Sequence, residues 1–354
     1  MDEIKILFVE DAESDIEAFE DAAQICKERN SYSIEYLICK TLDEARKELY
    51  KHFDGAIIDI KLGNENAGGN DVIKTINESL FRIPVIIFTA TPDNVSREFP
   101  IIEVFKKGEK SYIEVFDIFH NIYNTGLTKI MGGRGQFEDI IYNIFNKNII
   151  NQISEWFEYG KADPSKTEKA LLRYIINHLL QFLDDNDEDK YLPEELYIMP
   201  LENKIRTGSI FEKDGRFYVV MTPACDLVIR KDGICKTDKI LLAEIDDAIS
   251  ICKDEVDKIQ KIEKKRKKLE DIFKNNFTLY FHWLPQAKLF IGGLINFRKV
   301  IAVNQCEILE DYKNQMALIS PSFMKDVISR FSNYYARQGQ PDLDQSEIIK
   351  TFLE

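Results

Sequence analysis

Five short apolar segments, separated by segments with helical spacing, occupy the first 125 residues and restrict the fold of this region. Strands with so little internal polarity are buried on both faces, and helices between consecutive strands favour a parallel, doubly wound sheet. The expected strands cover residues 5–9, 33–38, 55–60, 84–89 and 101–105, and the expected helices cover residues 14–29, 41–52, 70–79 and 111–123. The sequence therefore predicts an α/β domain with a five-stranded parallel sheet.

Polar side chains that suit phosphoryl chemistry follow the ends of these strands. They are three carboxylates, a hydroxyl and a lysine pair, in the order Glu10, Asp11, Asp59, Thr89, Lys106 and Lys107. The carboxyl ends of parallel strands share one edge of the sheet, where such folds bind ligands. Crowded carboxylates repel one another, and Mg²⁺ with its preference for oxygen ligands relieves that repulsion. We therefore expect a site where a carboxylate accepts a phosphoryl group beside Mg²⁺ and a lysine.

Several blocks of residues 1 to about 125 resemble the response-regulator receiver domain of two-component systems. The blocks are ILFVEDA, DGAIIDIKLG, GGNDVI, PVIIFTAT and VFKKG, in the family's order and roughly at its spacing. The resemblance implies a flavodoxin-like fold, with Asp59 as the phosphoacceptor and Thr89 as the switch hydroxyl. The implied phosphate-binding lysine is Lys107, or Lys106 in the alternative register. The implied Mg²⁺ ligands are Glu10, Asp11, Asp59 and the backbone carbonyl of Lys61.

The chain departs from the family pattern near the fifth strand. Gly108 follows the lysine where the family has proline, and Val104 occupies the aromatic switch position. Pro92 and Pro100 bracket a short segment before the fifth strand, and proline disfavours helix at its own position and at the residue before it. We therefore expect the fourth helix of the receiver fold to be short or missing, without the usual coupling between threonine and aromatic residue.

Charge and hydropathy exclude several classes of function. Residues 1–125 contain 14 Lys and Arg against 25 Asp and Glu, which places −11 of the net charge of −14 in this region. Neither half has the basic excess of a nucleic-acid-binding protein. No segment is apolar enough to span a membrane and the N-terminus is acidic, so we expect a cytoplasmic protein. Six cysteines without a CxxC pair favour reduced, mostly buried thiols over a metal site.

The remainder of the chain divides at a glycine-rich segment. Residues 126–135 contain four glycines and are the expected linker. Residues 136–190 form a helical segment, in which two amphipathic helices pack on a core or on a second copy. Residues 191–354 are expected to form an α+β effector domain with a small β-barrel or sandwich. Its hairpin turns are predicted at residues 213–215 and around Asp232 and Gly233.

A charged helical arm, residues 247–276, is expected to interrupt these strands. Between Ile251 and Phe273 a narrow apolar stripe runs along one long helix that is otherwise mostly charged. Such a stripe favours a two-helix or coiled-coil contact, and we expect this arm to be the surface through which the protein associates. The KKRKK run within it is also able to contact phosphates, although interleaved acids favour a solvated face.

The effector domain offers one candidate site, formed by Thr222, Cys225, Asp226 and His282. Cys225 and Asp226 follow an apolar strand that stops at Pro223, and His282 lies in the segment FTLYFHWLP. A cysteine nucleophile needs a base such as histidine nearby. The pair Glu202 and Lys204 forms an E-x-K pattern of metal-dependent nucleases that is too short to be specific. Arg298 and Arg337 are weaker candidates.

These observations favour a phosphorylation-dependent signalling protein whose receiver controls an atypical effector that does not bind DNA. Its expected partners are a histidine kinase or phosphotransfer protein, and a protein target or second copy of itself. One alternative is an enzyme, a hydrolase or nuclease gated by the receiver. Another is a transcription regulator with an unrecognised DNA-binding surface, although no helix-turn-helix is visible.

Overall fold

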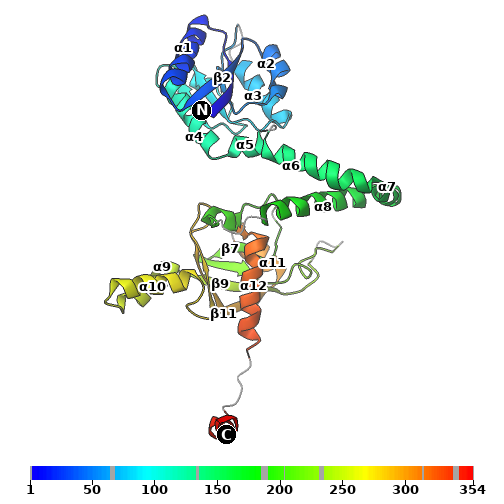
Figure 1. Ribbon diagram of the computed structural model, residues 1–354, viewed down its shortest axis with the longest axis vertical. Coiled ribbons are helices and arrows are strands. Elements are labelled where there is room, and N and C mark those ends of the chain that lie inside the picture. Colours follow the sequence, from blue (N-terminus) through cyan, green and yellow to red (C-terminus); the bar gives the residue numbers. More distant parts are fainter. Residues whose placement is uncertain are drawn as a thin grey trace. The chain divides into compact units, whose positions relative to one another are not determined.

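The computed structural model describes residues 2–63, 68–132, 135–184, 190–202, 204–230, 235–312, 315–337 and 343–353. The chain forms two compact units, Met1–Asp187 and Glu188–Glu354, which Figure 1 shows in blue to green and in green to red. Among the described residues, no helix is both long and apolar enough to cross a lipid bilayer.

The first unit contains a five-stranded sheet in the order β2-β1-β3-β4-β5, with every pair parallel. Its strands are β1 (Asp2–Val9), β2 (Tyr32–Cys39), β3 (Gly55–Ile58), β4 (Val85–Thr89) and β5 (Glu103–Lys106). Helices α1 (Glu13–Arg29) and α4 (Tyr112–Asn124) cover one face, and α2 (Leu42–Glu48) and α3 (Gly68–Glu78) cover the other (Figure 1). This order is that of flavodoxin-like doubly wound folds, which confirms the fold predicted for residues 1–125.

The alternation of side chains along β1 explains the two layers of helices. Ile4, Ile6 and Phe8 pack with aromatic residues of α1 and α4, whereas Leu7 and Val9 pack with α2 and α3. Successive side chains of a strand point to opposite faces, so a strand that is apolar throughout needs cover on both. Each large apolar side chain buried in this way stabilises the fold by ~1.5–3 kcal/mol.

The segment between β4 and β5 contains only a 3₁₀ turn, η2 (Pro92–Asn94). The remaining described residues from Val95 to Ile102 form neither helix nor strand. The prediction of a short or missing helix here is therefore confirmed. After β5, α4 begins with a capping box, in which the Ser111 hydroxyl accepts from the amide of Glu114 and the Glu114 carboxylate accepts from the amide of Ser111.

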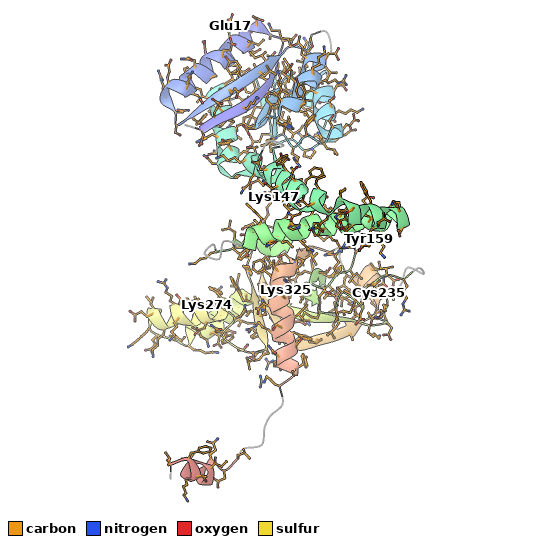
Figure 2. All side chains as sticks on the ribbon, turned by 45° about the vertical axis from the view of Figure 1, so that its right-hand side comes forward. Glu17, Lys147, Tyr159, Cys235, Lys274 and Lys325 are labelled. Atoms are coloured by element: carbon orange, nitrogen blue, oxygen red, sulfur yellow. The ribbon has the colours of Figure 1, made fainter. Side chains whose placement is uncertain are left out.

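A helical hairpin, residues 136–184, ends the described part of the first unit. The expected linker before it contains a short helix, α5 (Leu127–Met131). The first half of the hairpin comprises α6 (Gln136–Ile144), a π turn η3 (Phe145–Ile149), a 3₁₀ turn η4 (Ile150–Gln152) and α7 (Ile153–Ala162). Helix α8 (Pro164–Asp184) folds back along it, as Figure 2 shows beside Lys147 and Tyr159.

Asparagine side chains accompany the irregular turns in the first half of the hairpin. The amides of Asn146 and Asn151 donate to the carbonyls of Tyr142 and Lys147, each four residues earlier. Such side chains compete with backbone amides for helical carbonyls, and π turns widen a helix where its regular bonding is disturbed. This competition gives a physical account of the π and 3₁₀ turns at residues 145–152.

The second unit is built on one antiparallel sheet in the order β10-β11-β9-β8-β7-β12-β6. Its strands are β6 (Tyr197–Ile198), β7 (Ser209–Lys213), β8 (Arg216–Val220), β9 (Ile240–Asp246), β10 (Phe281–Leu284), β11 (Gly293–Val303) and β12 (Ala317–Ile319). The predicted barrel or sandwich takes the form of a single curled sheet. The other elements are η5 (Pro193–Leu196), α11 (Gln305–Asp311), α12 (Pro321–Tyr335) and α13 (Gln345–Leu353).

The two predicted hairpin turns of this sheet differ in outcome. Asp214 and Gly215 join β7 to β8 with φ values of 53° and 75°, as a two-residue hairpin turn requires. The second predicted turn, around Asp232 and Gly233, lies outside the described residues.

The charged arm is two helices rather than the one long helix that the sequence predicted. Helices α9 (Ala248–Asp257) and α10 (Ile262–Phe273) pack against each other, and Figure 1 shows them side by side in yellow. Folding back lets both apolar stripes reach the same cluster: Ile272 is buried with Phe281 and Leu294 of the sheet, and Ile251 packs against them. A single straight helix leaves half of that stripe in water, which explains the break.

Candidate functional site

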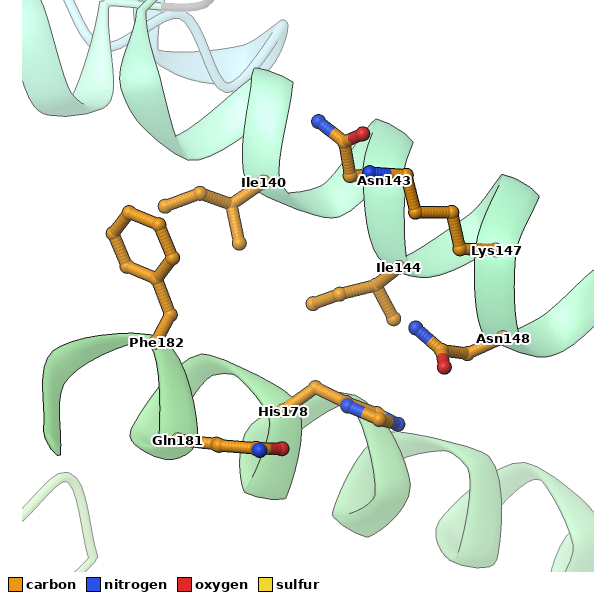
Figure 3. A pocket seen from close by; sticks show the side chains of 8 residues that line it. All are labelled: Ile140, Asn143, Ile144, Lys147, Asn148, His178, Gln181 and Phe182. Atoms are coloured by element: carbon orange, nitrogen blue, oxygen red, sulfur yellow. The ribbon is translucent and has the colours of Figure 1, made fainter. Parts of the chain in front are cut away.

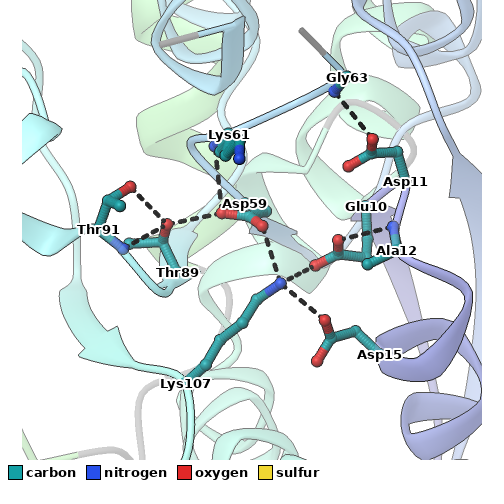
Figure 4. A network of polar contacts seen from close by, with 10 residues as sticks. All are labelled: Glu10, Asp11, Ala12, Asp15, Asp59, Lys61, Gly63, Thr89, Thr91 and Lys107. Carbon is teal, nitrogen blue, oxygen red and sulfur yellow. Dashed lines mark hydrogen bonds and ion pairs between the residues drawn. The ribbon is translucent and has the colours of Figure 1, made fainter. Parts of the chain in front are cut away.

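The parallel sheet places four functional side chains at one edge (Figure 4). Glu10 follows β1, Asp59 follows β3, Thr89 ends β4 and Lys107 follows β5. Glu10 and Thr89 are fully buried, and Asp59 is 5% exposed. All strands of a parallel sheet run in the same direction, so their carboxyl ends share one edge. Residues that are far apart in the sequence therefore converge there, as predicted.

The ammonium group of Lys107 lies at the centre of this cluster. Its Nζ atom is 2.8 Å from Oδ2 of Asp59 and 2.7 Å from Oε2 of Glu10. A third carboxylate, Asp15 of α1, lies 2.9 Å from the same nitrogen. The adjacent Lys106 is exposed on β5, and its amide donates to Glu109. Of the two alternative lysines, Lys107 is therefore the one that reaches Asp59.

The second carboxylate oxygen of Asp59 is also fixed. Oδ1 accepts a hydrogen bond from the Thr89 hydroxyl at 2.6 Å and one from the amide of Lys61 at 3.2 Å. Nearby, Asp11 is exposed, and its carboxylate accepts from the amide of Gly63 at 2.8 Å. The aspartate is thus held by a hydroxyl and an amide on one oxygen and by an ammonium on the other, as Figure 4 shows.

Burial controls the protonation of this cluster. It raises the pKa of Glu10 to about 7, although the hydrogen bonds from Lys107 and the Ala12 amide oppose this rise. For Lys107, burial alone lowers the pKa, but its hydrogen bonds to Asp59, Glu10 and Asp15 outweigh burial and raise it. The lysine therefore stays charged, which suits a group that neutralises carboxylate or phosphoryl oxygens.

Gly69 allows α3 to approach the backbone of Asp59. A Cβ atom at this position would lie 2.1 Å from the carbonyl oxygen of Asp59 and 2.7 Å from Cα of Ile60. The Gly69 amide also donates to the carbonyl of Ile60 at 2.9 Å. Only glycine fits where two backbones come this close, so Gly69 fixes the segment that follows the aspartate.

The oxygen atoms around Asp59 suit a hard divalent cation. Proteins hold Mg²⁺ with one or two carboxylates, and water and phosphate complete its shell. Glu10, Asp11 and Asp59 offer carboxylates, and Lys61 offers a backbone carbonyl two residues beyond Asp59. In the described part of the chain, no three His, Cys, Asp or Glu side chains are arranged to hold a metal alone. The donor set therefore fits Mg²⁺ with a partly aqueous shell rather than a site closed by protein ligands.

Two residues of this cluster escaped the sequence analysis. Asp15 lies in the first turn of α1, where an acidic residue is also a common helix-stabilising choice. Thr91 lies beside Thr89, with 3.5 Å between the two hydroxyl oxygens. The spacing of Asp15 carried a signal, because a side chain in the first turn of the helix that follows Glu10 lies near the end of β1. Sequence spacing alone does not separate that role from a helix-terminal one.

The structure does not assemble the site predicted in the second unit. Cys225 is exposed and its neighbour Asp226 is half-buried, with 3.7 Å between Sγ and Oδ1. Thr222 is buried, and its hydroxyl accepts from the amide of Leu241 at 2.7 Å, which is a structural role. Through the strand register, His282 is level with Phe217 at the start of β8 and three strands away from it, about 14 Å. The strand register therefore does not bring His282 close to Cys225.

His282 is buried beneath α12. Its Nδ1 atom lies 3.7 Å from the carboxylate of Asp326 but has no hydrogen-bond partner in the described residues. Burial, with a smaller effect from the Arg330 guanidinium, lowers the pKa of His282 to about 3. Proximity to Asp326 favours a charged ring and burial favours a neutral one. Burial prevails, because Asp326 is 64% exposed and its charge is screened by water.

The thiols and the E-x-K pair have ordinary surroundings. All described cysteines are unpaired, and Cys26, Cys39 and Cys235 are buried while Cys225 and Cys306 are exposed. Lys204 pairs with Glu202 itself at 2.5 Å.

A groove of about 1070 Å³ in the second unit was not predicted. It is lined by the ends of β6 and β12, by residues of the loop after β8 such as Pro223 and Leu227, and by α12. Its walls are mostly apolar, and their charged residues are Lys325 and the group in which Glu202 pairs with Lys204 and Arg206. Grooves of this kind bind small molecules or peptide segments.

No protein-family model and no curated protein sequence matches the chain. The solved structures that resemble it are response-regulator receiver domains, over the N-terminal third. One is the N-terminal domain of a response regulator/sensory box/GGDEF three-domain protein from Carboxydothermus hydrogenoformans, with 22% identity, a TM-score of 0.29 and coverage of 35% of this chain and 98% of that one. A two-component response regulator from Legionella pneumophila has 22% identity, a TM-score of 0.29 and coverage of 34% and 98%.

A third similar structure is a response regulator from Thermotoga maritima in complex with Mg²⁺ and BeF, with 22% identity, a TM-score of 0.27 and coverage of 34% of this chain and 99% of that one. The strand order defines the sheet of the first unit as a flavodoxin-like, doubly wound one.

Proposed function

We propose that the protein is a phosphorylation-dependent signalling protein in which Asp59 accepts a phosphoryl group. The observation that carries this proposal is the single cluster around Asp59, where the lysine ammonium and the threonine hydroxyl contact different oxygens of one carboxylate. A carboxylate accepts a phosphoryl group by in-line attack, and catalysis of that step is mostly positioning and charge neutralisation. Lys107 neutralises the arriving oxygens, and Thr89 orients Asp59 beforehand.

The proposed cofactor is Mg²⁺, held by Glu10, Asp11, Asp59 and the carbonyl of Lys61. When bound, it supplies the positive charge that phosphoryl oxygens and crowded carboxylates require. Lys107 would then share Glu10 and Asp59 with the cation. The carboxylate of Asp15, 2.9 Å from the Lys107 ammonium group, offers that lysine an alternative partner.

The proposed phosphoryl donors are a histidine kinase or phosphotransfer protein, and the proposed output is the second unit. That unit presents a curled sheet with an apolar groove and no helix-turn-helix among its described elements, which supports an effector that does not bind DNA. The hydrolase alternative loses its main support because His282 lies within β10, whereas Cys225 lies in the loop after β8, three strands across the sheet from β10.

Intact-mass measurement with acetyl phosphate tests the proposal. The full chain should gain one phosphate when Mg²⁺ is present and none when a chelator removes it. Asp59→Asn should gain none, because the amide is not a nucleophile. Asp21→Asn is the matched control, since it removes an exposed carboxylate of α1 outside the cluster and keeps the acceptor. Absence of label on the unaltered chain with donor and Mg²⁺ would refute the proposal.

A further inference from the structure

The helical hairpin has a second apolar face that no described residue of the first unit covers. On α8, Leu171, Ile175 and Leu179 are partly buried on the side that packs against the first half of the hairpin. The residues that follow each of them, and one further leucine, are 44–68% exposed: Leu172, Ile176, Leu180 and Leu183. A helix at the surface of a finished domain carries polar residues on its outer side. These four residues therefore form a stripe that has room for another partner.

The first half of the hairpin carries a matching stripe. Phe145, Ile153 and Phe157 are 48%, 37% and 61% exposed. Ile144 and Trp156, which precede two of them, face α8: Ile144 lines a hollow with residues of α8, and the Trp156 ring lies 5.7 Å from that of Tyr174.

Both stripes lie on one side of the hairpin. On each helix the exposed residue directly follows a residue that faces the other helix, a rotation of roughly 100° in the same sense. For two antiparallel helices, equal rotations of this kind lead to the same side of the pair. The stripes also cover similar stretches of the chain, twelve residues on α8 and thirteen in the first half of the hairpin.

We propose that this face joins two copies of the chain, whose hairpins pack about a two-fold axis as a four-helix bundle. Seven large apolar side chains that are about half exposed supply on the order of 600 Å² per copy, before flanking atoms are added. Stable interfaces bury about 600–1,000 Å² per partner. Two identical hairpins meet this requirement because a two-fold interface uses the same patch twice.

Charge favours a second copy over a strongly charged partner. Residues 136–184 contain five Lys and Arg against seven Asp and Glu, and the two signs are interspersed. The hairpin is thus close to neutral within an otherwise acidic first unit, so self-association is not opposed by like charge on this face.

The packing inside the hairpin also leaves room for a side chain from outside. A hollow of about 520 Å³ opens between α6 and α8. Figure 3 shows Ile140, Ile144 and Phe182 around it, with Asn143 and Gln181 at its margin. An isolated pair of helices has no enclosed core, and a second pair supplies the missing layer.

Light scattering of the full chain across protein concentrations tests the dimer. We expect a mass twice the 41.2 kDa of one chain. Ile176→Glu should weaken the dimer more than ~100-fold, because the two-fold axis buries the unpaired charge twice. Asn177→Glu is the matched control: the same charge one residue further on α8, at an exposed polar position, should leave the mass unchanged. Asp59→Asn should also remain dimeric, because the stripes do not involve Asp59.

A chain that is monomeric at every concentration would overturn the proposal, and so would a dimer that survives Ile176→Glu. Equal loss in both variants would overturn it as well, because the effect would then be general charge. The fold of the hairpin is monitored through Trp156 in a Trp283→Phe background. Where Ile176→Glu unfolds the hairpin, the milder Leu172→Ser, at a residue 58% exposed, provides the same comparison of mass.

Discussion

The parallel sheet of the first unit gathers functional side chains, whereas the antiparallel sheet of the second unit separates them. Lys107 and Asp59 are 48 positions apart in the sequence and meet at one edge, because both strands end there. In the antiparallel sheet, successive strands end at opposite edges. The sequence placed both His282 and Cys225 at strand ends. In the structure His282 lies within β10, level with the start of β8, and Cys225 lies in the loop beyond the other end of β8.

This difference between parallel and antiparallel sheets decides when a polar residue at the end of a predicted strand indicates a functional site. In a parallel sheet the end of every apolar segment predicts the same location, so a few polar residues at those ends define a site. In an antiparallel sheet the same pattern does not determine at which of two edges a residue lies, nor which strands are neighbours. A cluster predicted from strand ends is therefore strong evidence in the first unit and weak evidence in the second.

Replacement of Lys107 gives the largest expected effect. Lys107→Met removes the ammonium group that, among the described residues, pairs with Asp59, and it should slow phosphorylation from acetyl phosphate by ~100-fold or more. Lys106→Met should remain near the unaltered rate, because Lys106 is exposed on β5. The measurement is the rate at which phosphorylated mass appears. Equal rates for the two variants would show that convergence at the sheet edge does not produce the chemistry.

A glycine substitution tests how closely the parallel edge is packed. Gly69→Ala should lower the free energy of unfolding by ~3 kcal/mol, because the new methyl group meets the Asp59 carbonyl oxygen. Gly63→Ala has open space around it and differs only by its positive φ of 60°, so it should lower the free energy by ~1 kcal/mol. Urea unfolding followed by circular dichroism gives both values. Similar losses would mean that α3 moves freely away from Asp59.

The smallest expected effect concerns the pH dependence of the second unit. Burial lowers the pKa of His282 from its ordinary value of 6.5 to about 3, so below pH 6.5 the unfolded chain binds a proton that the folded chain does not. Stability is therefore fully present above pH 6.5 and is lost as pH falls toward 3. At pH 5 the loss is ~2 kcal/mol.

His282→Gln should remove this ~2 kcal/mol from the difference in unfolding free energy between pH 7 and pH 5. Trp283 lies beside His282, so urea unfolding in a Trp156→Phe background follows the second unit by fluorescence. An unchanged pH difference would mean that His282 is protonated in the folded chain, as a residue of a solvent-filled site would be.

Much of the first unit follows from its sequence. The apolar segments fixed the strands, and Pro92 and Pro100 correctly excluded a regular helix before β5. Asp15 was missed because its helix-terminal position has an ordinary explanation. Rules that apply to single strands were sufficient to predict this fold, because strands joined by helices in a parallel sheet have few possible topologies.

The second unit shows where such rules end. The break between α9 and α10 contains neither proline nor glycine, and it depends on a cluster with Phe281 and Leu294 that is distant in the sequence. The groove likewise depends on the packing of β6, β12 and α12 against one another, which no local sequence pattern predicts. These features result from tertiary packing, and the sequence alone predicted only that strands and a charged arm were present.

The π turn at Phe145–Ile149 has a consequence for local motion. The side-chain amides of Asn146, within this turn, and Asn151, just after it, donate to backbone carbonyls. A backbone hydrogen bond that is lost there is therefore partly replaced by one from a side chain. The free energy needed to open these few residues is then smaller than that for the continuous α8. Amide protons of residues 145–152 are accordingly expected to exchange with solvent first, and the hairpin opens from the middle of one helix rather than from its ends.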